Sequence, residues 1–312
     1  MNKKLIIRLS NNIGNQMFMY AAAYAFAKKI NAELLIDEET SFNYKNNLYK
    51  YSLDGFSLTS KLAPRNLKFL NLSGYLKRKF LKKINNIISK KNFYIEKQNK
   101  EKMSYFNDDF LKKNYNTNIF VEGYFQSEKY FSNFKNDIFG EFAFKSKNDY
   151  MNNPYFKMIK NSNSISICIR QNRFSEKQRK LNKNDYEKSK IFTEDQIKYV
   201  KKCMDIIKTK INRPKFFLWS NNNTNLVNYF PDDDVTAINN DKYVPEIHTY
   251  HLDLFLMTQT KHFIVTPSSF NWWGCWLSDN NNKIILRPSD QNFTNFKVNN
   301  KDFWPMGWVP ID

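Results

Sequence analysis

The sequence predicts an α/β protein built from two Rossmann-like domains that face each other across a cleft. The length of 312 residues fits two domains of ordinary size. Apolar strand-like segments alternate with helical segments in both halves, and polar loops follow these strands where α/β proteins build ligand sites. The weakly patterned stretch 145–160 separates the halves. We therefore assign residues 1–155 to an N-terminal domain and residues 156–312 to a C-terminal domain.

The N-terminal half opens with the pattern of a βαβ unit. Residues 4–9 (KLIIRL) are typical of a buried strand, and the polar loop that follows contains Gly14. Residues 17–30 are rich in alanine and apolar on most faces, which indicates a helix packed inside a domain. Residues 32–37 return as a strand, and 118–131 add a strand that leads through a loop into a helix. This order predicts a parallel sheet.

The C-terminal half alternates in the same way. Strands are expected at 163–170, 215–220, 262–267 and 283–288. Helices are expected at 192–207, with Thr193 as its N-cap, and at 251–260. A further helix begins in SSFNWWGCWLS, where Trp272 and Trp276 share one face because they are four residues apart. We interpret these tryptophans as core residues that position the helix.

Composition leaves several kinds of partner open. Hydrophobic residues make up 41% and aromatic residues 17% of the chain, which is ample for a packed core. The formal net charge of +19 attracts polyanions, so nucleic acid, anionic lipid and phosphorylated small molecules are all candidates. Much of the excess is lysine among asparagine and isoleucine, a bias that an AT-rich genome produces without selection for binding. Charge alone therefore selects none of them.

Sequence patterns argue against secretion, a membrane span and a metal site. The three cysteines lie far apart without a CxxC pair, which indicates neither a disulfide framework nor structural zinc. The first residues form no signal peptide, and no run approaches the roughly 18 to 20 apolar residues of a membrane span. His248 and His251 are three residues apart but lack a third ligand. We expect a cytoplasmic protein, in solution or peripheral at the inner face of the cell membrane.

The segment 75–91 predicts a basic amphipathic helix. It contains seven Lys or Arg residues and no acid. Its apolar residues recur at helical spacing: Leu76, Phe80, Ile84, Ile87 and Ile88. The two alternatives are packing of this stripe on its own domain and contact with an anionic membrane.

Polar residues after the strands are the candidate ligand contacts. The loop SNNIGNQ places backbone N–H groups at a helix start, a geometry that holds phosphate or carboxylate oxygens. Arg170 directly follows an apolar strand, where it would either bind two phosphate oxygens or pair with a carboxylate. Arg173 lies one turn further. Ser268 and Ser269 stand at a predicted helix N-terminus, which is a second anion site. The chain contains no GxGxxG, Walker or GxSxG motif.

Four ordered blocks of the chain resemble the bacterial alpha-1,2-fucosyltransferase family. GNQMFMYAAAYAFA is similar to the family's GNQMFQYA opening, and EGYFQSEKYF to its GYFQS segment. FFLWSNN is similar to the FSDD strand end, and HFIVTPSSFNWWGCWLS to the NSSFSWWGAWL segment. The resemblance implies a GT-B-like fold and inverting, metal-independent transfer from GDP-fucose to a sugar hydroxyl of a surface glycan, such as a lipid-linked oligosaccharide. The N-terminal domain would then be the acceptor side and the C-terminal domain the donor side.

The same resemblance implies roles for individual residues. Those expected to line the diphosphate or lie near the nucleotide are Gly14, Asn15, Gln16, Asn221, Ser268, Ser269 and Phe270. The family's HxRRxD stretch falls on CIRQNR, which keeps Arg170 as the catalytic cation. The second arginine is replaced by Gln171, and Arg173 occupies the place of the acid and is the candidate substitute cation. This departure leaves donors other than GDP-fucose open.

Two further questions stay open at the level of sequence. Glu122 and Asp253 are acids in plausible loops, but the sequence does not distinguish either as a general base. A polyanion or nucleic-acid binder is the alternative from another class, and it would need exposed aromatic rings on which bases stack. Because the tryptophans are interpreted as buried, we expect no nucleic-acid partner. A transferase fold that binds glycan without turnover is the third alternative.

Overall fold

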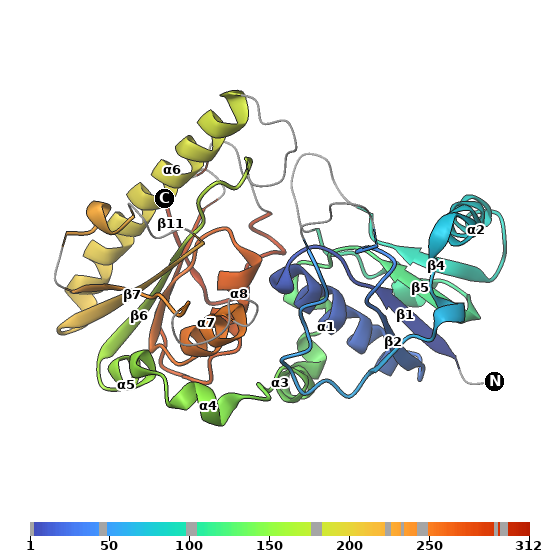
Figure 1. The fold of residues 1–312 in the computed structure, drawn as a ribbon, viewed down its shortest axis with the longest axis horizontal. Helices are drawn as coiled ribbons and strands as arrows, with labels where there is room; N and C mark the ends of the chain where they lie inside the picture. Colours follow the sequence, from blue (N-terminus) through green and yellow to red (C-terminus); the bar gives the residue numbers. More distant parts are fainter. Residues whose placement is uncertain are drawn as a thin grey trace. The chain divides into compact units, whose positions relative to one another are not determined.

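The computed structural model divides into two compact units (Figure 1). It describes residues 3–43, 49–97, 105–175, 183–221, 226–231, 234–241, 249–289, 293 and 299–312. Unit 1 comprises Met1–Lys145 and Lys301–Pro305, and unit 2 comprises Ser146–Asn300 and Met306–Asp312. Each unit is built around its own parallel sheet, so the prediction of an α/β protein with two Rossmann-like parts is confirmed.

The boundary between the units precedes the predicted join at residue 155. Helices α4 (Lys147–Met151) and α5 (Pro154–Lys160) belong to unit 2. The ring of Tyr150 packs on that of Phe255 in unit 2, with centroids 5.6 Å apart. This aromatic contact holds α4 on unit 2, although the local sequence reads as a linker.

Unit 1 also includes a short segment from near the C-terminus, which the sequence pattern did not indicate. The Asp302 carboxylate forms a 2.7 Å ion pair with Lys129, and the backbone oxygen of Asp302 accepts a 2.5 Å hydrogen bond from the Ser127 hydroxyl. The ring of Phe303 lies 6.5 Å from that of Phe18. These contacts join Lys301–Pro305 to unit 1.

The sheet of unit 1 has the strand order β3-β2-β1-β5-β4, and every neighbouring pair is parallel. The strands are β1 (Lys4–Arg8), β2 (Glu33–Asp37), β3 (Lys61–Leu62), β4 (Lys91–Ile95) and β5 (Tyr115–Glu122). The α-helices are α1 (Ile13–Lys29), α2 (Asn71–Ile84) and α3 (Lys135–Glu141), and the short 3-10 turns are η1 (Arg65–Leu67), η2 (Asp109–Lys112), η3 (Glu128–Tyr130) and η4 (Ser132–Phe134). Helix α1 connects β1 to β2, so the predicted βαβ opening is confirmed.

Helix α1 is buried on nearly all sides. Every residue from Gln16 to Ala27 is buried, because small alanines allow close approach and large rings fill the space between neighbouring elements. The ring of Phe26 stacks on Phe110 at 4.2 Å, and the Tyr20 hydroxyl donates a 2.5 Å hydrogen bond to Glu141. The core of unit 1 therefore fixes the position of the loop that precedes α1.

The sheet of unit 2 has six parallel strands in the order β11-β10-β9-β6-β7-β8. The strands are β6 (Asn163–Ile169), β7 (Pro214–Ser220), β8 (Val235–Ala237), β9 (His262–Ile264), β10 (Ile285–Pro288) and β11 (Val309–Ile311). The remaining helices are α6 (Lys183–Lys210), α7 (Thr249–Thr258) and α8 (Ser269–Trp276), with a 3-10 turn η5 (Val227–Tyr229). All four predicted strands are present in this sheet.

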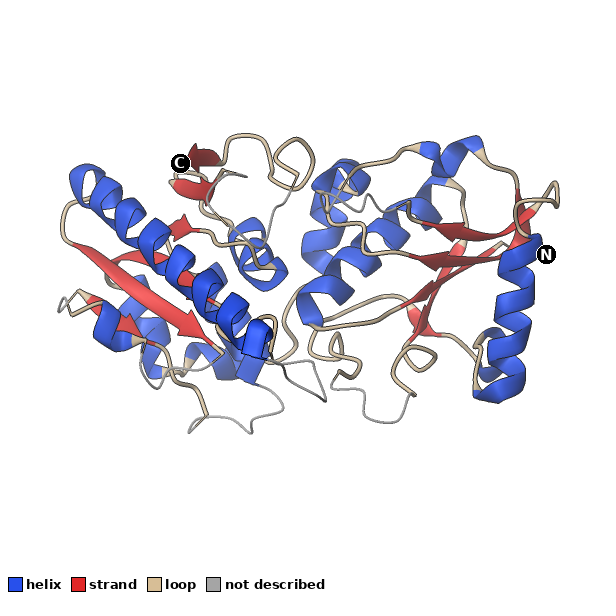
Figure 2. Ribbon diagram, turned by 90° about the horizontal axis from the view of Figure 1, so that it is seen from above, coloured by secondary structure: helices blue, strands red, loops and turns tan. Residues whose placement is uncertain are grey.

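Alternate residues of β6 face the two sides of this sheet. Ile165, Ile167 and Ile169 belong to the hydrophobic core that α6 covers. The intervening residues, including Cys168, therefore face the side of α7 and α8. Figure 1 shows α6 and the α7–α8 pair on opposite faces of the sheet, and Figure 2 shows α6 as the long helix along one face of it.

Helix α6 begins earlier than expected. Thr193 lies in its interior and donates a 2.9 Å hydrogen bond to the backbone oxygen of Ser189, so the prediction that Thr193 is an N-cap is wrong. The apolar face of the helix continues N-terminally through Phe192, which packs in the core. In the described part of the chain no helix is both long enough and apolar enough to cross a bilayer.

The tryptophans of α8 are core residues, as predicted. Trp272 and Trp273 have no exposed surface, and the Trp272 and Trp276 rings stack with centroids 5.9 Å apart. Gly274 faces α7, where an added Cβ would lie 2.2 Å from the Met257 sulfur. The tryptophans and this close helix contact hold the first turn of α8 in place.

Helix α2 packs only part of its predicted apolar stripe on its own domain. Ile84 and Ile88 are half-buried, whereas Leu76, Phe80 and Ile87 are 54%, 62% and 84% exposed. The helix ends at Ile84, so the prediction of a helix that continues to residue 91 is wrong. The helix lies against the edge strand β4 (Figure 1), but no residue of α2 is fully buried.

Candidate functional site

The predicted ligand residues of unit 2 gather at one edge of its sheet. Arg170 follows β6, while Asn221 follows β7 and Ser268 follows β9 on either side of it. The pairing is in register, with Ile169 opposite Ser220 and Ile167 opposite Ile264. The hydroxyl of Thr266 donates a 2.6 Å hydrogen bond to the backbone oxygen of Cys168. Three neighbouring strands therefore bring Arg170, Asn221 and the Ser268–Ser269 turn together at their carboxyl ends.

The backbone of Arg170 is clamped by the buried amide of Gln196 from α6. The Arg170 N–H donates to Gln196 Oε1 at 3.1 Å, and Gln196 Nε2 donates to the Arg170 oxygen at 2.9 Å. The arginine is half-buried. These two hydrogen bonds fix the Arg170 backbone, so its side chain extends from a defined position at the strand end.

Asn221 and Gln171 form a second clamp beside the first. The Gln171 N–H donates to Asn221 Oδ1 at 2.8 Å, and Asn221 Nδ2 donates back to the Gln171 oxygen at 3.1 Å. The Gln171 side chain donates to the Ser220 hydroxyl at 3.2 Å, so a neutral contact occupies the place of the family's second arginine. Asn221 therefore positions the Arg170 loop, and its contact with a nucleotide stays a prediction.

Arg173 lies further along this loop, against α6. Its guanidinium carbon is 5.6 Å from the centre of the Phe192 ring. The loop is anchored there because the N–H groups of Phe174 and Ser175 donate to the Ser189 hydroxyl at 3.0 and 3.1 Å. The role of Arg173 as a substitute cation stays a prediction.

Ser268 begins α8 in extended conformation with φ −138° and ψ 127°. Its backbone oxygen accepts the Trp272 N–H at 2.9 Å, but its hydroxyl makes no capping hydrogen bond to the helix. Ser268 is buried, whereas Ser269 and Phe270 are half-buried. The first turn and the positive end of the helix dipole lie at this edge, and binding of an anion by these three residues stays a prediction.

Asp253 adds an acid to the same edge, on the opposite face of the sheet from α6. It lies on α7, accepts a 2.6 Å hydrogen bond from Asn240 Nδ2 and contributes to the raised pKa of Cys168. Burial raises the pKa of Asp253 to about 7. Sequence reasoning could not select this acid, because its environment depends on Asn240 from a separate loop.

The histidines give no support for a metal site. His251 is buried beside the Tyr250 ring, with centroids 4.4 Å apart, while His248 lies outside the described residues. Within the described ranges no three His, Cys, Asp or Glu side chains form a group suited to a metal ion.

The loop and first turn of α1 form the corresponding edge of unit 1. Gln16 has no exposed surface, and its amide binds the backbone oxygens of Asn11 and Lys50 at 2.7 and 2.8 Å and the Ser52 N–H at 2.9 Å. Gln16 therefore positions two loops, and its contact with the diphosphate stays a prediction.

Gly14 and Asn15 stand in the same turn. Gly14 is buried, whereas half-buried Asn15 accepts a 2.5 Å hydrogen bond from Gln126 and donates one of 2.9 Å to Asn12. Gln126 lies in the EGYFQS segment after β5, so two of the recognised blocks meet here. The binding roles of Gly14 and Asn15 stay predictions.

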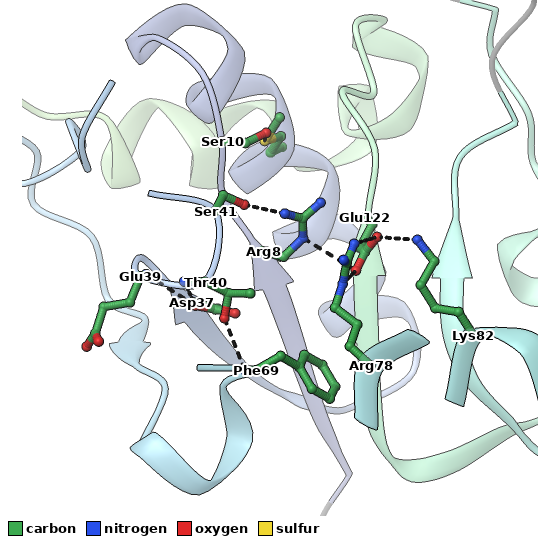
Figure 3. Close-up of polar contacts among 11 residues, drawn as sticks. Arg8, Ser10, Asp37, Glu39, Thr40, Ser41, Phe69, Arg78, Lys82 and Glu122 are labelled. Atoms are coloured by element: carbon green, nitrogen blue, oxygen red, sulfur yellow. Dashed lines mark hydrogen bonds and ion pairs between the residues drawn. The ribbon is translucent and has the colours of Figure 1, made fainter. Parts of the chain in front are cut away.

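A charged cluster that the sequence did not indicate lies at this edge (Figure 3). Glu122 at the end of β5 is surrounded by Arg78 at 2.6 Å, Lys82 at 2.8 Å and Arg8 at 3.4 Å, and Arg8 also donates to the Ser41 hydroxyl. Burial raises the pKa of Glu122, but hydrogen bonds from Arg78 and Lys82 and the charge of Arg8 outweigh it and lower the value to about 2. Glu122 is thus an ionised structural acid and unsuited to act as a general base.

Parallel sheets in two Rossmann-like units, with ligand-type residues at the carboxyl ends of the strands, define an α/β fold of the GT-B type. The model of glycosyl transferase family 11 matches residues 1–312, and the chain belongs to this family of fucosyltransferases.

Known proteins agree with this assignment. An alpha-1,2-colitosyltransferase of Escherichia coli is 26% identical over 321 residues, covering 99% of both chains. The O-antigen biosynthesis glycosyltransferase WbnK of Escherichia coli is 26% identical, covering 97% of this chain and 99% of that protein. Among solved structures, the fucosyltransferase NodZ from Bradyrhizobium aligns with a TM-score of 0.53 and 13% identity, covering 88% of this chain and 92% of that one. A mutant of Arabidopsis thaliana FUT1 in complex with GDP aligns with a TM-score of 0.51 and 12% identity, covering 89% and 69%.

Proposed function

We propose that the protein transfers fucose from GDP-fucose to a sugar hydroxyl of a bacterial surface glycan, with inversion and formation of an alpha-1,2 linkage. The observation that carries this proposal is the family match along the whole chain, combined with Arg170 and the Ser268 turn at neighbouring strand ends of one sheet. The names of the two Escherichia coli relatives support the linkage and an O-antigen type of acceptor.

In this mechanism Arg170 stabilises the leaving group. The bond between the anomeric carbon and the β-phosphate oxygen breaks, and negative charge grows on the departing GDP. The Arg170 guanidinium and the first-turn amides of α8 bind that charge, so the expected mechanism requires no metal ion. The acceptor hydroxyl attacks the opposite face of the anomeric carbon, and its proton passes to solvent water as the C–O bond forms.

A donor related to fucose is the second candidate. It is favoured by the similarity to an alpha-1,2-colitosyltransferase. Colitose is fucose without its 3-hydroxyl group, so both donors present the same diphosphate and the same 6-methyl group. Recognition of the sugar would then decide between them.

The test is transfer by the full chain from separate GDP-fucose, GDP-colitose, GDP-mannose and UDP-galactose to oligosaccharides that end in galactose. We expect GDP release that depends on acceptor with one of the two 6-deoxy donors, and an alpha-1,2 product by NMR. Transfer from GDP-colitose alone would select the second candidate. Acceptor-dependent turnover with UDP-galactose alone, or none with any donor, would refute the proposal.

Nucleic-acid binding is disfavoured by the burial of the tryptophan rings. All six tryptophans are at most 7% exposed, so none is available to stack on bases. Salt-sensitive binding of single-stranded nucleic acid, together with no affinity for GDP, would favour this alternative over a transferase.

A further inference from the structure

We propose that the outward face of α2 docks the protein on an anionic membrane surface. This inference extends the proposed function, because it provides contact with the lipid surface on which a lipid-linked acceptor would lie. It rests on the orientation of α2, in which Leu76 and Phe80 face outward while Arg78 faces unit 1.

The inward face of α2 is held on unit 1 by polar contacts. Arg78 and Lys82 make ion pairs of 2.6 and 2.8 Å with Glu122. The turn after the helix is held by the Asn85 amide, which accepts two backbone N–H groups of β4 and donates to the Phe93 oxygen at 3.0 Å. Gly74 lies so close to Phe69 that an added Cβ would be 2.6 Å from its carbonyl carbon. The helix therefore cannot rotate its apolar residues inward without breaking these contacts.

The outward face is apolar. Leu76 and Phe80 are each two residues from Arg78, a rotation of about 200°, so they lie on nearly the opposite side of the helix from it. Leu72 continues the ridge one turn earlier and is 72% exposed, and Ile87 follows the helix in the next turn. Leu72, Leu76 and Phe80, four residues apart, thus form an exposed row, and Ile84, the next residue at this spacing, is half-buried. Exposed apolar ridges of this kind mark interaction surfaces.

Positive charge surrounds this ridge. Lys77, Lys79 and Lys83 are all exposed, and the segment from Asn71 to Lys91 contains no acid. Apolar side chains beside lysines fit an anionic bilayer, in which the chains enter the acyl boundary and the ammonium groups meet phosphates. Most of the ridge is aliphatic and cannot stack on bases, and Phe80 is its one ring, which favours lipid over nucleic acid as the partner. A second copy of the chain would oppose two lysine-rich helices, which repel each other.

The test measures sedimentation of the full chain with vesicles, in the absence of any sugar nucleotide. We expect binding to phosphatidylcholine vesicles that contain phosphatidylglycerol and little binding to phosphatidylcholine alone. The variant Leu76→Gln/Phe80→Gln should lose about tenfold or more in partitioning, because the apolar ridge is interrupted. Lys79→Gln/Lys83→Gln should weaken binding to the anionic vesicles, as added salt should.

The matched control is Leu111→Gln, which changes a 56% exposed leucine elsewhere in unit 1 and should leave vesicle binding unchanged. Transfer to a water-soluble acceptor should be the same in Leu76→Gln/Phe80→Gln as in the unaltered protein, which shows that the variant is folded. Vesicle binding that persists in this variant would overturn the inference. The inference would also be overturned if Leu76→Gln/Phe80→Gln changed the oligomeric mass but not vesicle binding. Binding of single-stranded RNA through α2, without vesicle binding, would overturn it as well. Vesicle binding without sugar transfer would refute the proposed function alone.

Discussion

Replacement of Glu122 by glutamine should destabilise unit 1 through loss of a buried charge. The carboxylate side chain is 7% exposed and lies among three cations: Arg8, Arg78 and Lys82. Glutamine has nearly the same shape but no charge, so the cations would repel one another with no compensating anion. The perturbation therefore isolates the electrostatic part of the cluster.

The size of the effect follows from the pKa of Glu122. A value lowered from 4.5 to about 2 corresponds to about 3 kcal/mol of folding free energy at neutral pH. Water reaches part of the cluster, since the Lys82 side chain is 31% exposed and that of Arg8 is 23% exposed. Solvation of the freed cations reduces the loss, so we expect a cost of about 2 to 3 kcal/mol.

The assay is urea unfolding of the full chain at neutral pH, followed by circular dichroism. The Glu122→Gln midpoint should fall by roughly 1 M relative to the unaltered protein. Asp108→Asn is the matched control, because Asp108 also pairs with a lysine but its side chain is 67% exposed. The reasoning is refuted if both variants unfold at the same urea concentration as the unaltered protein.

The same carboxylate gives a pH dependence of defined sign. Its folded-state pKa is depressed, so its contribution is complete above the unfolded value near 4.5 and is lost as the pH falls toward about 2. The difference in stability between the unaltered protein and Glu122→Gln should therefore shrink across this interval. A difference that stays constant between pH 5 and about 2 would contradict the assignment of the low pKa to Glu122.

Three further predictions concern the reaction and the core. Arg170→Ala should lower kcat about 100- to 1000-fold. Thermal unfolding should change little, because the hydrogen bonds from Gln196 go to the Arg170 backbone and are kept in the variant. The control is Arg65→Ala at an exposed position, and full turnover of Arg170→Ala would remove its catalytic role. Activity should persist in excess EDTA, and a loss that magnesium restores would contradict metal-free transfer. Gly274→Ala should destabilise unit 2 by about 1 to 3 kcal/mol, because the added methyl group would lie 2.2 Å from the Met257 sulfur. The control is Gly140→Ala, where nothing lies within 4 Å of the added methyl group. Equal thermal midpoints of the two variants would contradict a tight α7–α8 contact.

Local sequence patterns determined most of the fold. The apolar runs at 4–9 and 163–170 and the alanine-rich segment 17–30 each match an observed strand or helix, because burial requires their spacing of apolar residues. The loops at the strand ends also followed from sequence, since parallel strands end at a common edge. The four motif blocks indicated the family in addition, although they do not determine which sugar is transferred.

Other features depended on groups brought together from distant parts of the chain. Glu122 and Asp253 look alike in sequence, yet three cations lower the pKa of the first and burial raises that of the second. The assignment of Gln16 to loop positioning required its contact with Lys50.

Helix α2 shows the same division most clearly. Its amphipathic pattern and its positive charge are properties of the sequence alone. The ion pairs of Arg78 and Lys82 with Glu122, 40 or more residues away, decided which face points inward. A helical pattern defines an apolar face, but only the partners that pack against the helix determine whether that face is buried or exposed.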